Sequence, residues 1–355
     1  MKRTLTSVYA WLLLLAFLGG QVLLFVLPFL REQDSLALAT VIGFALSCAL
    51  TPTVHELGHI LFAKAQNMCI VYTKFFAFCV RFDGKKRKVS LSSPFAYDQT
   101  QALPRSAGKM QSRAFWYTLG GLIFSAAFLA VLIVLVTVFS QSVPLISSVA
   151  LGALPYAAYS FLLNVVPLEY ASGRTDALVA VGIERGSDSE SVMIAAMEIY
   201  GGLGEGKTYG EIDGKWYEAN PILPEDDPMH AVLLELKYRR ALDLGDFNGA
   251  ADALNRLTAS SEYLSDQEHV DVAFELIFMH AISGDKERAS ECFSLVEKEF
   301  EKAPLRVRVA YARLFEGAEK MQELLATEEE TALGVLCGMV ASEKKMLEKL
   351  RIGAL

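Results

Sequence analysis

The chain has 355 residues, of which 53% are hydrophobic and 21% are charged, and its formal net charge is −8. Residues 1–184 contain 14 Lys and Arg against 8 Asp and Glu, whereas the remaining residues contain 19 against 33. This division favours a hydrophobic membrane domain followed by an acidic soluble domain, and the acidic half argues against nucleic-acid binding because it would repel phosphates.

Four apolar stretches are long enough to cross a bilayer, which takes about 20 residues. They are Tyr9–Leu30, Ser35–Ala63, Ala114–Phe139 and Val143–Val166. The first has a longer apolar run than a signal peptide and no small-x-small cleavage site, so we expect a retained helix. The loop 66–113 holds nine basic residues against two acidic ones. The positive-inside rule therefore predicts that this loop and both termini are cytoplasmic, in a multi-pass protein of a bacterial cell membrane.

Within that loop, Ile70–Phe82 and Val89–Phe95 are rich in Val, Phe and Tyr and flank the sequence Asp83-Gly84-Lys85-Lys86. This pattern predicts a β-hairpin at the membrane surface. Its Phe side chains would enter the lipid interface and its basic residues would bind lipid headgroups. A solvated charged turn fits the same residues equally well. An edge strand here would also accept an extended substrate by strand addition.

The chain after Arg185 has a water-soluble composition. Ser191–Tyr200 predicts a short helix, residues 185–228 form a Gly/Pro-rich connecting segment, and residues 229–355 have helical periodicity throughout. We therefore expect domains at 1–184 and 229–355, joined by 185–228.

Two segments of the last domain resemble each other. Ala241–Ala250 and Ala281–Ala289 each read as a helix, a Gly-Asp turn and a second helix. Such pairs resemble tetratricopeptide repeats, although Gly284 follows Gly245 by 39 residues and the usual period is about 34. Repeats of this kind stack into surfaces that bind proteins, so a protein partner is expected here.

The segment from Gly201 to Thr208 matches the phosphate-loop pattern GxxxxGK[ST]. That motif binds phosphate only between a buried strand and the N-terminus of a helix. Here the preceding residues have a helical pattern, and Tyr209–Gly214 cannot begin a good helix. We therefore expect no nucleotide binding.

The central motif is His55-Glu56-Leu57-Gly58-His59. Residues four apart lie on one face of a helix, so both imidazoles can reach one metal ion. Glu56 can take a proton from a zinc-bound water, whose pKa zinc lowers to about 7. Each unpaired charge inside an apolar helix costs about 2.5–3.5 kcal/mol or more, which favours a metal partner over chance occurrence. The other three histidines are expected to be surface or packing residues: His230, His269 and His280.

At these residues the sequence resembles the site-2 protease family of intramembrane metalloproteases, whose HExGH element it matches at every fixed position. The family's Asn-x-x-Pro element resembles Asn164-Val-Val-Pro167. The Asp that follows as zinc ligand resembles Asp176 at the end of Ser172-Gly-Arg-Thr-Asp176. Two departures are a longer interval before the Asp and an Ala in place of the Gly that often follows it. The resemblance covers about residues 36–180.

A third family element, Gly-Gly-Pro followed by Asn, is present only as Gly120-Gly121-Leu122 and Ser125. The small residues still permit close helix packing, while the missing Pro and Asn put a gating role in doubt.

The resemblance implies a zinc endopeptidase with His55, His59 and Asp176 as ligands and Glu56 as general base. Glu169 and Asp83 remain competing third ligands. Asn164 is implied to bind the substrate backbone, and a helix-end cap is an equal alternative for it.

We therefore expect an all-α polytopic membrane protein with four transmembrane helices, a small β-hairpin and a soluble α-helical repeat-like domain. It would hydrolyse a peptide bond in or near a transmembrane segment of a membrane-protein substrate, and its helical domain would recruit or regulate that substrate. One alternative is a catalytically idle scaffold that binds partner proteins, which an intact Glu56 argues against. Another is a peptidase that acts on cytoplasmic peptides at the membrane surface.

Overall fold

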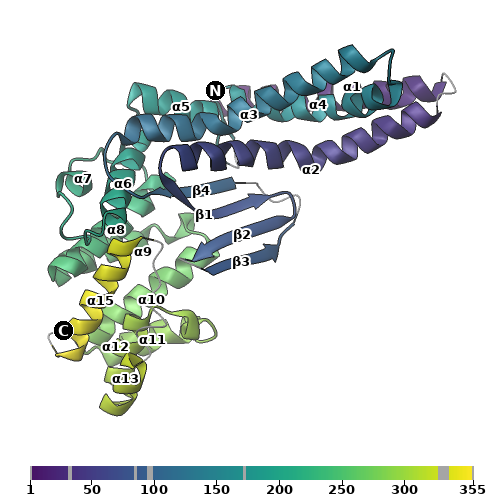
Figure 1. Cartoon of the computed structure of the whole chain (residues 1–355). Helices are drawn as coiled ribbons and strands as arrows, with labels where there is room; N and C mark the ends of the chain where they lie inside the picture. The colour runs from purple at the N-terminus through teal and green to yellow at the C-terminus, as the bar shows by residue number, and fades with distance from the viewer. Residues whose placement is uncertain are drawn as a thin grey trace. The chain divides into compact units, whose positions relative to one another are not determined.

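The computed structural model describes residues 2–30, 34–83, 86–93, 99–170, 173–326 and 336–353. These residues are mostly helical, with a four-stranded and a two-stranded sheet (Figure 1). The chain forms two compact units. The first comprises Met1–Leu103 and Lys109–Ser187, and the second comprises Pro104–Gly108 and Asp188–Leu355.

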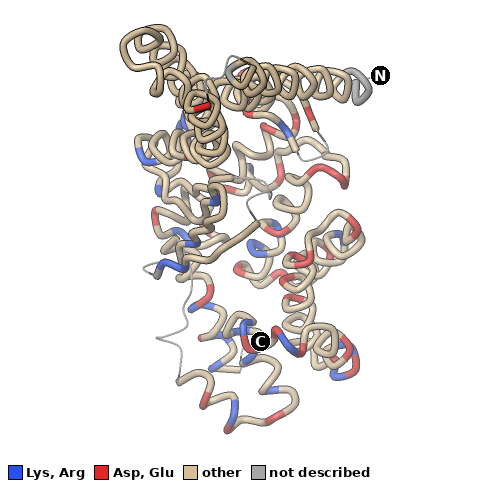
Figure 2. The backbone as a smooth tube through the Cα atoms, turned by 90° about the vertical axis from the view of Figure 1, so that its right-hand side faces the viewer, with Lys and Arg blue, Asp and Glu red and all other residues tan. Residues whose placement is uncertain are grey.

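All four predicted membrane spans are helices. They are α1 (Lys2–Leu30), α2 (Asp34–Ala65), α3 (Met110–Phe139) and α4 (Pro144–Val165). Each is long and apolar enough to cross a membrane, and Figure 2 shows long charge-free stretches along them. A helix satisfies every backbone hydrogen bond within itself, which is why an apolar run of this length takes that form in lipid.

Small residues bring α2, α3 and α4 close together. A Cβ atom added at Gly58 of α2 would lie 2.3 Å from the backbone oxygen of Gly120 in α3, and one at Gly43 would lie 1.9 Å from that of Val149 in α4. Only glycine permits these approaches, so the helix that carries the HExxH motif is held directly against its two neighbours.

The sheet is larger than the predicted hairpin. Its strands are β1 (Met68–Phe75), β2 (Phe78–Asp83), β3 (Lys86–Leu91) and β4 (Gln99–Pro104), in the order β3-β2-β1-β4. Asp83 pairs with Lys86, as expected for the predicted hairpin, while Gly84 and Lys85 lie outside the described residues. The prediction of one strand over Ile70–Phe82 is wrong, because the chain turns at Phe76 and Ala77 and Phe75 pairs with Phe78. Phe95 lies outside the described residues.

After α4 the first unit ends in a short hairpin of β5 (Glu169–Tyr170) and β6 (Gly173–Arg174), followed by α5 (Asp176–Arg185). These elements return the chain from the end of α4 to the HExxH motif.

The second unit is helical. Its elements are α6 (Asp188–Gly204), α7 (Lys215–Glu218), α8 (Pro228–Leu244), α9 (Phe247–Ala259), η1 (Ser261–Tyr263), α10 (Asp266–Ser283), α11 (Lys286–Val296), η2 (Phe300–Lys302), α12 (Leu305–Phe315), α13 (Ala318–Leu325) and α15 (Cys337–Arg351). Tyr238, Leu254, Ile277, Phe278 and Leu350 are among the residues that form its core.

The two predicted Gly-Asp turns are present. Gly245 and Gly284 adopt positive φ angles of 81° and 78°, and Asp246 and Asp285 cap the helices that follow. Glycine takes this left-handed conformation without steric cost, which allows each helix to end and the next to fold back. Gly317 makes a similar turn before α13, with φ of 96°. The similarity between the two segments of this domain did not predict that third turn.

Residues 185–228 differ from the predicted connecting segment. Residues 188–228 belong to the second unit, and α6 continues four residues past the predicted end at Tyr200. Its glycines do not interrupt it because they face closely packed neighbours, as Gly202 faces Ile212. The helix predicted before the phosphate-loop-like sequence is present, and it extends into that sequence as far as Gly204.

Candidate metal centre

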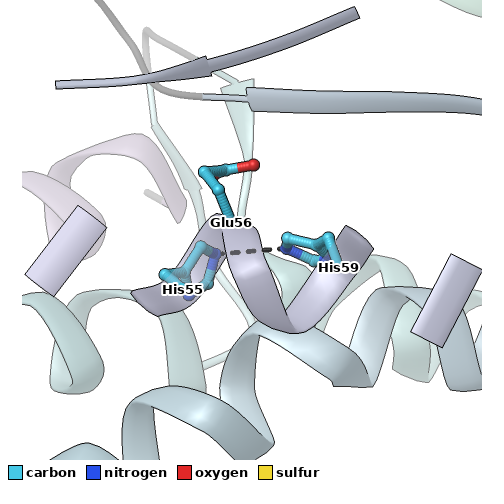
Figure 3. Close-up of side chains that lie close together, drawn as sticks. All are labelled: His55, Glu56 and His59. Atoms are coloured by element: carbon cyan, nitrogen blue, oxygen red, sulfur yellow. Dashed lines mark hydrogen bonds between the residues drawn. The ribbon is translucent and has the colours of Figure 1, made fainter. Parts of the chain in front are cut away.

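His55, Glu56 and His59 lie on α2, where the helix is buried by its neighbours. The Nε2 atoms of the two histidines are 3.2 Å apart. Figure 3 shows the imidazoles side by side and the Glu56 side chain extending away from them. Only 9% of His55, 3% of Glu56 and 6% of His59 is exposed. The predicted one-face arrangement of the two imidazoles is present.

Asp176, the first residue of α5, completes this group. Its Oδ2 atom lies 3.1 Å from His55 Nε2 and 3.4 Å from His59 Nε2. With the 3.2 Å between the nitrogens, the three atoms form a nearly equilateral triangle. Zinc bonds of about 2.0–2.1 Å in a tetrahedron require ligand atoms about 3.3 Å apart. The triangle therefore has the dimensions of one face of a tetrahedral zinc site.

The electrostatics of the group also fit a cation. Asp176 Oδ2 and Glu56 Oε2 are buried without a partner in hydrogen-bond geometry among the described residues. Burial disfavours the ionised form of Asp176, but the two imidazoles beside it hold its pKa below the ordinary value. Two unsatisfied carboxylate oxygens in a buried site are costly, and a bound cation would remove that cost.

Glu56 is set apart from the three convergent atoms. One of its oxygens lies with the histidine nitrogens in a group of atoms that are all within 4.8 Å of one another. Its carboxylate lies next to the side chain of Thr100 on β4. Thr100 is also bonded to Thr73 of β1, and Tyr117 of α3 donates to its carbonyl. The sheet therefore lies beside the carboxylate, with the edge strand β4 nearest to it.

The far side of each imidazole is fixed by α3. His59 Nδ1 lies 3.0 Å from the carbonyl oxygen of Tyr117, which can only accept, so Nδ1 donates this bond and Nε2 is the nitrogen available to a metal ion. His55 Nδ1 lies 3.0 Å from Ser125 Oγ. Such contacts orient metal-binding histidines and raise their basicity.

Gly121 and Ser125 have roles that the sequence comparison did not assign. A Cβ atom at Gly121 would lie 2.4 Å from His59 Nε2, so only glycine leaves room for the imidazoles. Ser125 stands where the family motif has Asn and bonds His55. The small-residue pattern suggested packing alone, because nothing in it identifies the histidines as neighbours.

Thr175 fixes the start of α5. Its hydroxyl donates to the Val166 carbonyl at 2.9 Å and accepts the Leu168 and Leu178 N–H groups, each at 3.2 Å. The side chain is 3% exposed, so all three hydrogen-bonding positions of the hydroxyl are used inside the protein. It thereby ties the end of α4 to the residue before Asp176. A Thr three residues before Leu178 is an N-cap signal that could have identified it.

The other predicted site residues lie elsewhere. Glu169 is exposed on β5, opposite Arg174, so Asp176 is the predicted third ligand that contacts the histidines. Asn164 is half-buried in the last turn of α4. The side chain of Asp83 and the residue Ser172 lie outside the described part of the chain.

Comparisons with known proteins found no matching family model, no similar curated protein and no similar solved structure. The resemblance to site-2 proteases therefore stays a prediction based on the motifs.

Proposed function

We propose that the chain is an intramembrane zinc metalloprotease that hydrolyses a peptide bond in or near a transmembrane segment of a membrane-protein substrate. The observation that carries the proposal is the triangle of His55, His59 and Asp176 atoms, 3.1–3.4 Å on a side, with the Glu56 carboxylate next to it, whose Oε2 atom has no hydrogen-bond partner among the described residues. A ligand-only site has no use for that fourth ionisable group.

In this proposal His55, His59 and Asp176 hold the ion and one coordination position stays open, as in catalytic zinc sites. When bound, zinc lowers the pKa of a water ligand to about 7 and polarises a carbonyl oxygen. The Glu56 carboxylate takes the proton of the attacking water and delivers it to the amine that leaves. The hydroxyl of Thr100, next to Glu56, would orient the carboxylate for this transfer.

The surroundings support a substrate that is itself in the membrane. The motif lies on one of four helices that are long and apolar enough to cross a bilayer. A substrate must be extended before its peptide bond can be attacked, because a helix shields its own backbone. An edge strand accepts an extended chain by backbone hydrogen bonds, and β4 is such an edge with Thr100 beside Glu56. Asn164 is the proposed further contact to the substrate backbone.

The second unit would recruit or regulate the substrate through its helical hairpins, which resemble protein-binding repeats. The termini would be cytoplasmic and the basic residues of β2 and β3 would bind lipid headgroups.

The test is the zinc content of the detergent-purified chain, measured together with cleavage of a single-span substrate. We expect about one zinc per chain, lost in His55→Ala and in His59→Ala. Glu56→Gln should keep the zinc and lose hydrolysis, because it removes the base and no ligand. The control is His269→Ala, an exposed histidine of the second unit, which should change neither quantity.

Three results would contradict the proposal. A zinc-free unaltered protein would remove the metal site. Equal zinc loss in Glu56→Gln would make Glu56 a ligand instead of the base. Zinc without hydrolysis of any single-span substrate or free peptide would favour the scaffold.

A further inference from the structure

The second unit includes a short piece of chain from the first half of the sequence. Residues 104–108, which join β4 to α3, cluster with residues 188–355. The strand before this connector carries Thr100, and the helix after it carries Tyr117. These two residues contact Glu56 and His59. The connector therefore joins two elements that orient the proposed catalytic residues.

Two carboxylates of the second unit bind successive backbone groups of the connector. Glu198 Oε2 accepts the Gly108 N–H at 2.8 Å, and Glu205 Oε1 accepts the Ala107 N–H at 3.0 Å. Glu198 lies on α6 and Glu205 directly follows the last residue of that helix, Gly204, so both carboxylates lie at the end of α6. Hydrogen bonds to an ionised carboxylate are the stronger kind, and Glu198 is only 9% exposed.

The glycines between these carboxylates allow the connector to approach α6. A Cβ atom at Gly201 would lie 2.7 Å from Ala107 Cα, and one at Gly204 would lie 2.5 Å from the Arg105 carbonyl carbon. Both obstacles are backbone, which cannot rotate away. The first glycines of the phosphate-loop-like sequence thus serve close packing against residues 105–107.

The connector is held in an unusual conformation. Gly108 has φ of 94° and Lys109 has φ of 58°, immediately before α3 begins at Met110. A residue other than glycine rarely adopts a positive φ, and keeps it only when surrounding interactions hold it. The bond from Glu198 to Gly108 is such an interaction, one residue from Lys109.

We propose that Glu198 and Gly201 are positioning residues, through which the second unit sets the placement of β4 and of the first turns of α3. The inference rests on the proposed protease function, which it extends to regulation of the same site. The end of α6 also contacts the rest of the second unit, because α15 packs against it. A Cβ at Gly338 would lie 2.0 Å from the Lys207 carbonyl oxygen.

The test compares two adjacent glycine substitutions in the full-length protein. Gly201→Ala adds a methyl group against the Ala107 backbone, whereas Gly202→Ala adds one against the Ile212 side chain. Both variants place an alanine in α6, so helix propensity changes equally in the two. They differ only in the atoms that the added methyl group contacts. Amide hydrogen exchange is followed in the connector, in β4 and in the first turns of α3, alongside zinc content and substrate cleavage.

We expect Gly201→Ala to accelerate exchange in all three segments and to lower cleavage by about 10- to 100-fold, since misplacement by about 1 Å costs about 100-fold. Its zinc content and the exchange of α8 and α10 should stay at the level of the unaltered protein. Gly202→Ala should leave hydrogen exchange, zinc content and substrate cleavage unchanged. Glu198→Ala should reproduce the effect, and Glu198→Gln, which keeps an acceptor oxygen, should restore most of the lost activity.

The proposal would be overturned if Gly201→Ala accelerated hydrogen exchange only in residues 105–109 and not in β4 or α3. It would also be overturned if Gly201→Ala and Gly202→Ala had equal effects on exchange and cleavage. The exchange comparison does not depend on hydrolysis. If the unaltered protein cleaves no substrate, the proposed function is refuted, but the exchange comparison of the two glycine variants can still be interpreted.

Discussion

Replacing Thr175 by Val should weaken zinc binding although Thr175 is not a ligand. Valine keeps the shape of the side chain and removes the hydroxyl, whose partners are the Val166 carbonyl and the Leu168 and Leu178 N–H groups. The substitution therefore weakens the attachment of α5 to the end of α4 and removes none of the three proposed ligand residues.

The expected size follows from those three bonds. Each contributes about 0.5–1.5 kcal/mol net, so the attachment of α5 should lose about 2–4 kcal/mol. Asp176 follows directly, and the loss frees it to move from the two imidazoles. Groups that orient metal ligands typically account for about 10- to 100-fold in affinity, and we expect zinc affinity to fall within that range.

The assay is competition for zinc against a chromophoric chelator, with detergent-purified full-length protein. Thr175→Ser keeps the hydroxyl and should bind zinc within about threefold of the unaltered protein, a difference below 1 kcal/mol. Thr40→Val is the matched control, because Thr40 is also buried and its hydroxyl bonds only its own helix, at Leu36. Unchanged zinc affinity in a folded Thr175→Val protein would refute the reasoning, as would an equal loss in Thr175→Ser.

Three further predictions concern the rest of the chain. Reporter fusions after residue 113 and at the carboxyl end should both report cytoplasm, and an outside signal from either would break the four-span topology. Arg306→Met removes the 2.6 Å partner of the buried Glu275, which keeps its contacts with Arg239 and Tyr238, and should destabilise the second unit by about 1–3 kcal/mol in denaturant titrations. The exposed Arg288→Met should cost under about 1 kcal/mol. Burial opposes ionisation of Glu275, but Arg239 and Arg306 hold its pKa below the ordinary value. Its contribution to stability, complete above about pH 4.3, should therefore disappear on further acidification in the unaltered protein.

The sequence predicted the four long helices because an apolar run of that length has one way to satisfy its backbone in lipid. The spacing of His55 and His59 likewise predicted their shared face, since four residues are about one helical turn. The Gly-Asp turns at Gly245 and Gly284 followed from the need for a left-handed residue. Each of these features depends on residues close together in the chain.

Several other features were not predicted from the sequence. The turn at Phe76 and Ala77 has no Gly, Pro or Asn to mark it, and Phe76 takes a positive φ of 52° instead. Ser125 and Gly121 acquire their roles only when α3 lies against α2. Gly201 and Gly204 matched a nucleotide motif, whereas their packing partners are almost a hundred residues earlier in the sequence.

The most direct test of the metal site is the zinc affinity of Asp176→Asn compared with that of Glu169→Gln. Both substitutions remove one carboxylate charge after α4, but Asp176 lies within 3.4 Å of both histidine nitrogens and Glu169 is exposed on β5. We predict that Asp176→Asn loses most of the zinc and the hydrolysis, and that Glu169→Gln keeps both. Zinc retained in Asp176→Asn and lost in Glu169→Gln would contradict the three-residue site.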